Sequence, residues 1–185
     1  RRRNVDHLRC GLGRVGLGGL VGHHVTGAHR LRELCGSRVV VAAAAKTEGA
    51  DVEVKDGDVI RFGRHALTTI ATPGHTDGCL SFVTEDRAMV FTGDSLMIRA
   101  AGRTDFQQGN ARTLYRSVHE RLFTLPDTCV VFPGHDYAGR TCTTIGEEKA
   151  NNPRLGGDKS EDDFVGYMAN LGLPHLNQIA VAVPA

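Results

Sequence analysis

The chain has 185 residues, of which 41% are hydrophobic and 23% are charged, and its formal net charge is +1. These values are typical of one globular domain with a sizeable core, and no charge excess points to nucleic acid or a membrane surface. No run of about 18 apolar residues predicts a transmembrane helix.

The N-terminal segment differs in composition from the rest. Residues 1–32 contain seven arginines, many glycines and one acidic residue, Asp6, with no convincing strand or helix period. Transit peptides are Arg-rich and acid-poor but also Ser-rich and amphipathic, so a disordered, damaged or misread segment is favoured. Residues 11–16 match G-x-G-x-x-G, but no strand precedes them and no helix follows, which argues against a nucleotide site. We predict an atypical segment over residues 1–23 and one domain over residues 24–185.

The central part of the chain has the pattern of short strands separated by tight turns. Apolar or β-branched runs alternate with Gly-, Asp- and Glu-containing turns, which predicts one buried strand, two successive hairpins and a last strand. The predicted strands cover residues 38–45, 59–62, 66–71, 79–84, 87–91 and 130–132.

Two helices are predicted in the second half. Residues 110–125 carry apolar residues at helical spacing, with Asn110 as the N-cap and Pro126 after the end. Ser160 opens a further helix, because three acidic residues follow it near the positive end of the helix dipole. Strand pairs followed by alternating helices and strands predict a layered α/β sandwich.

Three apolar strands end at a glycine followed by a His or an Asp. These residues are His75, Asp94 and His135. Strand ends can direct side chains to one point, and His and Asp are ligands that suit zinc or non-heme iron. The pattern therefore predicts a metal-dependent enzyme. Thr76 and Thr92 lie beside ligands, where hydrogen bonding to the ligands and simple turn capping are both open.

The cysteines bear on the compartment of the protein. Their odd number, wide spacing and lack of a C-x-x-C pair favour free thiols in a reducing compartment over a disulfide framework. They are Cys10, Cys35, Cys79, Cys129 and Cys142.

Several longer motifs carry a family resemblance. The sequence resembles the persulfide dioxygenase branch of the metallo-β-lactamase-fold superfamily, a branch related to glyoxalase II, over about residues 24–185. The first two motifs below are shared across the superfamily, whereas the later ones resemble this branch in particular. The motifs are TPGHTDGC at 72–79, FTGD at 91–94, GRTDFQQG at 102–109, TLYRSVHE at 113–120, PGHDY at 133–137, EE at 147–148 and NPR at 152–154.

The resemblance implies an αβ/βα sandwich and one Fe(II) per chain, with zinc as the alternative metal. His75 and Asp94 match two of the three iron ligands, and His24 matches the last histidine of an H-x-H-x-D-H motif. His135 matches a histidine that lies near the iron in the dioxygenases and binds metal in two-metal relatives.

Further site residues follow from the same resemblance. Arg103, Asp105 and Asp136 match residues that brace the site, and Tyr137 and Arg154 are candidates for binding the glutathione part of a substrate. A purely structural ion pair is the alternative for Arg103 and Asp105.

The sequence departs from the family at its first metal-binding motif. Residues 19–24 read GLVGHH, so Gly19 and Val21 stand where the two leading histidines belong and His23 stands in place of the aspartate. Only His24 matches, and the N-terminal sheet is expected to be incomplete. His23 as a substitute ligand is the less favoured interpretation.

The resemblance implies a mononuclear non-heme iron dioxygenase that oxidises glutathione persulfide to sulfite and glutathione with O₂. The alternatives are a glyoxalase-II-like glutathione thioester hydrolase and a catalytically dead homologue. A homodimer is a possible assembly, with no nucleic acid or membrane partner. The expected location is the cytoplasm in a bacterium or the mitochondrial matrix in a eukaryote.

Overall fold

In the computed structural model, residues 4–5, 28–46, 49–105 and 108–173 are described. They form a seven-stranded mixed sheet in the order β1-β4-β5-β6-β7-β8-β9 and a separate two-stranded parallel sheet, β2-β3. The strands are β1 Asn4–Val5, β2 Val40–Ala42, β3 Val52–Val54, β4 Val59–Phe62, β5 His65–Ala71, β6 Leu80–Thr84, β7 Met89–Gly93, β8 Val130–Pro133 and β9 Thr143–Thr144. The helices are α1 Ala28–Cys35, the 3₁₀ turn η1 Ala43–Ala45, α2 Ala111–Ser117, the π-helix η2 Val118–Leu122, α3 Ile145–Asn151 and α4 Glu161–Ala169.

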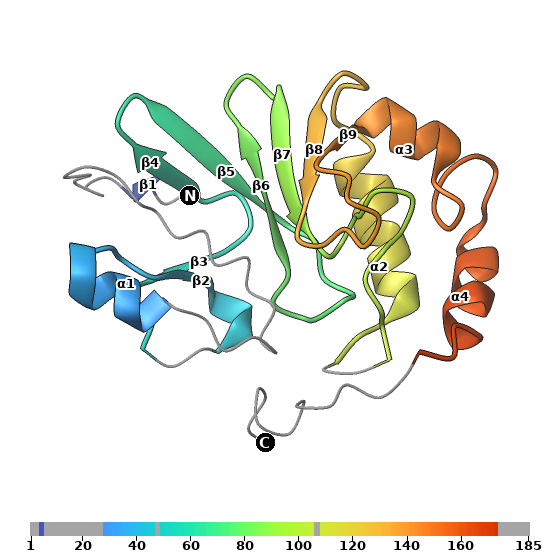
Figure 1. The fold of residues 1–185 in the computed structure, drawn as a ribbon, viewed down its shortest axis with the longest axis horizontal. Helices are drawn as coiled ribbons and strands as arrows, with labels where there is room; N and C mark the ends of the chain where they lie inside the picture. Colours follow the sequence, from blue (N-terminus) through green and yellow to red (C-terminus); the bar gives the residue numbers. More distant parts are fainter. Residues whose placement is uncertain (1–3, 6–27, 47–48, 106–107, 174–185) are drawn as a thin grey trace.

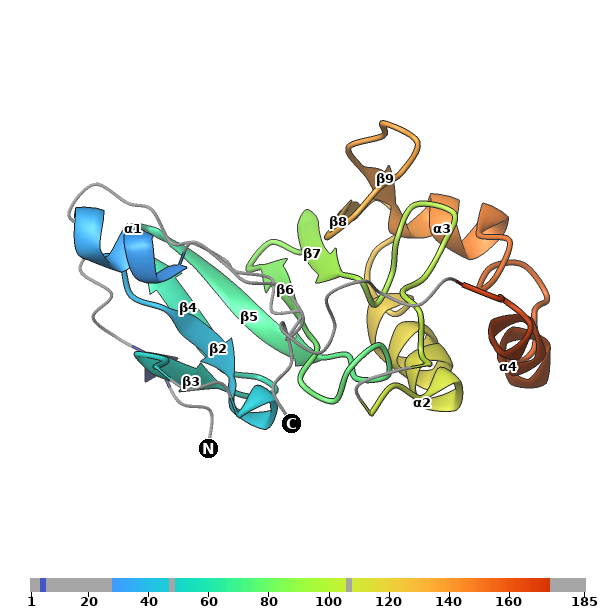
Figure 2. The same ribbon diagram turned by 60° about the horizontal axis from the view of Figure 1, so that its bottom comes forward.

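The two faces of the large sheet pack against different layers. Along β6 the side chains alternate, so that Val83 joins a core cluster with residues of α2 and α4, whereas Leu80 and Phe82 pack against a second cluster. The second cluster contains Val40 of β2 and Val54 of β3. Figures 1 and 2 accordingly show α2, α3 and α4 beside β7–β9, with α1, β2 and β3 at the other end of the sheet. This arrangement confirms the predicted α/β sandwich.

The two predicted hairpins are confirmed. β4 pairs with β5 and β5 with β6 in antiparallel register, and β6 pairs in the same way with β7. The β4–β5 turn needs a left-handed residue, and Gly63 supplies it at a φ of 60°. The β6–β7 turn instead places Arg87 at a φ of 55°.

The parallel pairing of β7 and β8 matters most for the site. The chain leaves β7, passes through α2 and η2, and returns as β8 in the same direction, with Gly93 opposite Pro133. The residues that follow these strands therefore emerge at one edge of the sheet. A hydrogen bond from the Gly134 N–H to the Gly93 carbonyl, at 2.8 Å, joins the two strand ends.

The predicted helices form at the expected places. Asn110 caps α2 by accepting a hydrogen bond from the Thr113 N–H, but the regular helix ends at Ser117 and continues as the π-helix η2. Ser160 caps α4 in a capping box with Asp163, as its sequence indicates.

Several predictions of secondary structure are wrong. Strand β8 is not the last strand, because β9 follows it and pairs antiparallel. The predicted strand over residues 38–45 shortens to β2, followed by η1. The segment 1–32 shows no convincing strand or helix period in its sequence, yet it contains β1 and the start of α1. Apart from β1, the atypical segment predicted over residues 1–23 lies outside the described residues, and so do His23 and His24.

The described chain offers no obvious membrane span. Among its helices, none combines the length and the apolar character that crossing a bilayer requires. Cys35, Cys79, Cys129 and Cys142 are all free thiols, as predicted for these four cysteines.

Candidate active site

Asp94 follows β7 directly and points into the protein. The β7–β8 register shifts between Phe91 and Gly93, and Gly93 has a φ of 54°, so the chain turns sharply before the aspartate. Only 6% of Asp94 is exposed. A carboxylate at such a depth requires a hydrogen-bond donor or a cation beside it. His135 supplies a donor to Oδ1, and the ring of His75 lies beside Oδ2.

His75 is held by the loop that follows β5. Gly74 has a φ of 128°, and a Cβ at this position would lie 2.3 Å from the backbone nitrogen of Leu114, so only glycine fits here. The buried imidazole donates a hydrogen bond from Nδ1 to the Arg103 carbonyl at 2.7 Å. Because a carbonyl only accepts, this bond fixes the tautomer and leaves the lone pair of a neutral ring on Nε2. Nε2 lies 3.5 Å from Oδ2 of Asp94.

His135 approaches the other oxygen of the same carboxylate. Its Nδ1 lies 2.7 Å from Oδ1 of Asp94, and the ring is about one-third exposed. The ring of Tyr137 stacks on it, with the centroids 6.1 Å apart and the planes 7° from parallel. Tyr137 itself is 88% exposed, so it offers an aromatic face at the surface next to His135. The three strand-end residues predicted from sequence are thus brought together around Asp94.

Comparisons with known proteins agree with this geometry. The sequence profile of the metallo-beta-lactamase superfamily matches residues 13–135. The chain belongs to this superfamily. It is 53% identical over 162 residues to the human protein named persulfide dioxygenase ETHE1, mitochondrial, covering 88% of this chain and 63% of the relative. The predicted persulfide dioxygenase branch is therefore confirmed as the sequence family, although the chain spans less than two thirds of that relative's length.

A solved structure supports the same branch of the superfamily. The crystal structure of ETHE1 from Myxococcus xanthus is 48% identical, with a TM-score of 0.83 over 89% of this chain and 71% of that one. A hydroxyacylglutathione hydrolase from Cereibacter sphaeroides is less similar, at 34% identity over 71% of this chain and 51% of its own length.

Whether a metal ion fits the site depends on which side-chain donor atoms lie close together around Asp94. Within the described part of the chain, no three His, Cys, Asp or Glu side chains are arranged to hold a metal. His75 Nε2 and the Asp94 carboxylate nevertheless lie side by side, and they fit two positions of the two-histidine, one-carboxylate set of non-heme iron sites. The third predicted ligand, His24, lies outside the described residues, so the ligand set stays a prediction.

Arg103 and Asp105 form a two-pronged ion pair. The guanidinium of Arg103 donates from Nε and Nη2 to the two carboxylate oxygens of Asp105, each at 2.7 Å. This hydrogen bonding raises the pKa of Arg103. The pair fits both the bracing role and its purely structural alternative, and the direct link to the site is the Arg103 carbonyl that accepts from His75.

Asp136 and Arg154 make contacts within the surrounding structure. Asp136 accepts from the backbone N–H and the side chain of Arg140, and the backbone bond is the main cause of its lowered pKa. Arg154 donates to the Ala101 carbonyl at 3.0 Å and lies 5.2 Å from the ring centroid of Tyr167. Their roles in bracing and substrate binding stay predictions.

A small buried hydrogen-bond network, which the sequence analysis did not single out, joins Thr72, Ser81 and Ser95. The Ser95 hydroxyl donates to the Thr72 carbonyl at 2.9 Å, and the Thr72 and Ser81 hydroxyls lie 3.0 Å apart. Thr76 and Thr92 likewise bond within their own turns, to Cys79 Sγ and the Leu96 carbonyl, which supports turn formation as their role. Thr72 and Ser95 belong to the segments TPGHT at 72–76 and TGDS at 92–95, and this position next to the candidate ligands was the signal that the sequence offered for the network.

Burial explains the state of Cys79. The thiol is 8% exposed and its pKa is raised, mainly by that burial. The residue is therefore a packed thiol beside the histidine loop.

Two glycines shape the site through close contacts that the sequence did not predict. A Cβ on Gly102 would lie 2.8 Å from His75 Nδ1 and 2.6 Å from the Asp94 carbonyl oxygen. A Cβ on Gly134 would lie 2.9 Å from Asp94 Oδ1. The absence of a side chain at both positions lets neighbouring backbone approach the site residues closely.

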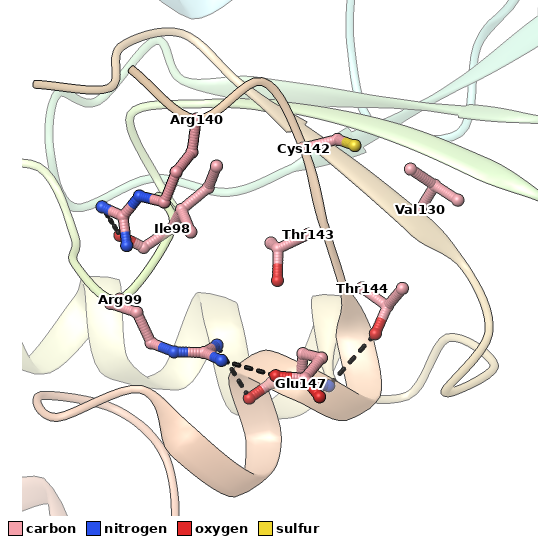
Figure 3. A pocket seen from close by; sticks show the side chains of 8 residues that line it. All are labelled: Ile98, Arg99, Val130, Arg140, Cys142, Thr143, Thr144 and Glu147. Atoms are coloured by element: carbon pink, nitrogen blue, oxygen red, sulfur yellow. Dashed lines mark hydrogen bonds and ion pairs between the residues drawn. The ribbon is translucent and has the colours of Figure 1, made fainter. Parts of the chain in front are cut away.

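A pocket of about 450 Å³ opens beside β9, and it is not formed by the three strand-end residues (Figure 3). Its charged side chains are engaged, since Arg99 pairs with Glu147 and Arg140 donates to the Ile98 carbonyl. The lining residues are Ile98, Arg99, Val130, Arg140, Cys142, Thr143, Thr144 and Glu147.

Proposed function

We propose that this chain is the catalytic part of a mononuclear non-heme iron dioxygenase that oxidises glutathione persulfide with O₂ to sulfite and glutathione. The observation that carries the proposal is the buried His75–Asp94 pair, with the His75 tautomer fixed by the Arg103 carbonyl. The similarity to proteins named persulfide dioxygenase ETHE1 supports this activity over thioester hydrolysis.

Three side chains hold the metal in this proposal. His75 binds through Nε2 and Asp94 through its carboxylate, and His24 supplies the remaining protein ligand. Fe(II) bound there would supply open coordination positions for the persulfide sulfur and O₂, and the redox chemistry between them. Zinc is the competing metal, because the same ligand types suit it.

The protein's own contribution is orientation. The hydrogen bond to the Arg103 carbonyl keeps the proton on Nδ1 of His75, so Nε2 faces Asp94 as an acceptor. His135 donates to Oδ1 of Asp94 and so fixes the rotation of the carboxylate. Burial of His75 and Asp94 strengthens both interactions by excluding water.

The substrate meets the site from the Tyr137 side. The exposed ring of Tyr137, stacked on His135, offers an aromatic face and a hydroxyl to the glutathione part. Arg154 is the second glutathione-binding residue, and Arg103, Asp105 and Asp136 brace the site. This activity resides in residues 24–185, in the cytoplasm of a bacterium or the mitochondrial matrix of a eukaryote, with a homodimer as a possible assembly.

The test is oxygen uptake by the full chain after anaerobic loading with Fe(II), started by adding glutathione persulfide. Asp94→Asn keeps the shape of the side chain but removes the charge, and uptake should fall by at least about 100-fold. Asp127→Asn is the matched control, because Asp127 is 70% exposed and pairs only at the surface with Lys149. Circular dichroism establishes that all three proteins are folded.

Each alternative has its own outcome. Hydrolysis of a glutathione thioester by the zinc-loaded chain, without oxygen uptake by the iron-loaded chain, would identify the glyoxalase-II-like hydrolase. Folded protein that takes up no oxygen and hydrolyses no thioester would identify a catalytically dead homologue.

A further inference from the structure

The loop that leaves Asp94 also carries the carbonyl that orients His75. This loop, residues 95–103, closes on its own beginning, because the Gly102 N–H donates to the Asp94 carbonyl at 2.7 Å. Within it, Met97 and Ala100 exchange two backbone hydrogen bonds, and Arg99 has a φ of 57°. A non-glycine residue with such a φ persists only where its surroundings hold it.

The surroundings that hold Arg99 are centred on Glu148 of α3. This carboxylate is fully buried, and Oε2 accepts from the Arg99 N–H at 2.9 Å while Oε1 accepts from Arg99 Nη1 at 2.7 Å. Thr143 Oγ1 donates to Oε1 at 2.9 Å and Asn152 Nδ2 donates to Oε2 at 2.8 Å. Four donors offset the high cost of burying a charge, so the carboxylate stays fixed in position.

Two side chains near α3 hydrogen-bond the next two carbonyls of the loop, those of Ala100 and Ala101. Asn152 Nδ2 also donates to the Ala100 carbonyl at 3.1 Å, and Arg154 Nη1 donates to the Ala101 carbonyl at 3.0 Å. Three consecutive residues, 99–101, are therefore tied to α3 and the segment after it. Gly102 and Arg103 come immediately next, and there the Arg103 carbonyl meets His75.

We infer that Glu148 is a positioning residue for the metal site: through Arg99 and Asn152 it sets the 95–103 loop so that the Arg103 carbonyl holds His75 in its binding orientation. This role rests on the proposed function, because the orientation of His75 matters for activity only if His75 binds the metal. Glu147 makes a useful contrast, because it pairs with the same arginine but is 55% exposed (Figure 3). The buried Glu148 carboxylate, rather than the ion pair of Glu147 at the surface, positions the loop.

The test compares Glu148→Gln with Glu147→Gln in the full chain. In Glu148→Gln an NH₂ group replaces one carboxylate oxygen, either the one that accepts from the Arg99 N–H or the one that accepts from Arg99 Nη1. In both orientations a donor meets a donor of Arg99, so the loop should lose its anchor. The direct readout is the ¹⁵N–¹H signal of the His75 Nδ1 proton in metal-free protein, assigned by its loss in His75→Gln. We expect this signal to be protected in the parent chain and in Glu147→Gln, and to be lost through rapid exchange in Glu148→Gln.

A second readout is the affinity for Co(II), followed by its visible absorption. We expect the Kd to rise about 10- to 100-fold in Glu148→Gln and by less than about threefold in Glu147→Gln. Phe164→Leu, in the buried core of α4, controls for a general loss of stability. It should lower the melting temperature while leaving the His75 proton protected.

Several outcomes would overturn the positioning role. They are a protected His75 proton in folded Glu148→Gln, an equal loss of that signal in Phe164→Leu, or no protected proton in the parent chain. If Glu148→Gln does not fold, Arg99→Lys tests the positioning role instead. This substitution keeps the positive charge and the backbone N–H but removes the planar guanidinium with its several donors. An unchanged His75 signal in Arg99→Lys also overturns the role. A parent chain that binds no Co(II) but shows the expected proton pattern would refute the proposed function alone.

Discussion

Replacing Gly102 by alanine adds one methyl group at the point where backbone comes closest to the candidate metal site. The backbone of Gly102 is not in the left-handed region, so alanine meets no conformational penalty and the effect is purely steric. Its Cβ would lie 2.8 Å from His75 Nδ1, 2.9 Å from His75 Cγ and 2.6 Å from the Asp94 carbonyl oxygen.

The size of the expected effect follows from these distances. Ordinary contact begins at 3.4 Å, so the imidazole must retreat by about 0.6 Å, or the 95–103 loop must move by a similar amount. Overpacking of this kind costs about 1–3 kcal/mol, which lowers the melting temperature of a chain of this size by about 2–12 °C. A displacement beyond about 0.5 Å also exceeds what a preorganised site tolerates, so Co(II) affinity should fall about tenfold or more.

The assay pairs thermal unfolding with Co(II) titration, and Gly166→Ala is the matched control. Gly166 lies inside α4 with no atom within 4 Å of an added Cβ, so alanine there should stabilise the protein by about 0.5–1 kcal/mol. The same substitution is therefore expected to act with opposite sign at the two glycines. A Gly102→Ala protein with unchanged stability and unchanged Co(II) affinity would refute the close approach between residue 102 and His75.

Two further predictions concern charge and thiol chemistry. Glu161 of α4 accepts from two arginines of α2, first Arg116 and then Arg112, which lower its pKa to about 2. Because the folded pKa lies below the ordinary value of 4.5, the ionised carboxylate stabilises the fold above pH 4.5, and this contribution disappears as the pH falls toward 2. Melting temperatures of the parent and Glu161→Gln should differ at pH 7 and converge near pH 2; a constant difference would contradict the pairing. Among the four described cysteines, burial and a raised pKa should protect two thiols from iodoacetamide in native protein, while the two exposed thiols react. Peptide mass spectrometry measures the labelling, and equal labelling of all four would contradict the packing. The protected residues are Cys79 and Cys129, and the exposed ones are Cys35 and Cys142.

Local sequence chemistry was sufficient to predict the parts of the fold that depend on neighbouring residues. The hairpins follow from apolar runs and turn residues, and the caps at Asn110 and Ser160 follow from side chains that reach the first turn of their own helix. His75 and Asp94 were found because a tight turn with glycine precedes each of them. The start of α3 carried a similar signal, since Thr144 and Glu147 have capping-box spacing, and it was overlooked.

Contacts between distant segments were beyond this reasoning. The His75–Arg103 hydrogen bond spans 28 residues, and the Arg99–Glu148 contact spans 49. Neither residue type nor spacing specifies which carbonyl an imidazole will meet. The conversion of the end of α2 into a π-helix also depends on packing, because its sequence reads as a continuous amphipathic helix.

The precision of the candidate site comes from glycine positions more than from its exposed charges. The glycines that matter are Gly74, Gly102 and Gly134, on three different segments. An added Cβ would fall within 3.0 Å of the Leu114 backbone from Gly74, of the His75 ring from Gly102 and of the Asp94 carboxylate from Gly134. Side-chain ion pairs at the surface contribute little energy and tolerate movement, whereas a backbone contact without a side chain fixes a distance to a few tenths of an ångström. Substitutions at these glycines should therefore reduce metal affinity more than substitutions in the half-exposed Arg103–Asp105 pair, provided that the Arg103 carbonyl keeps its place.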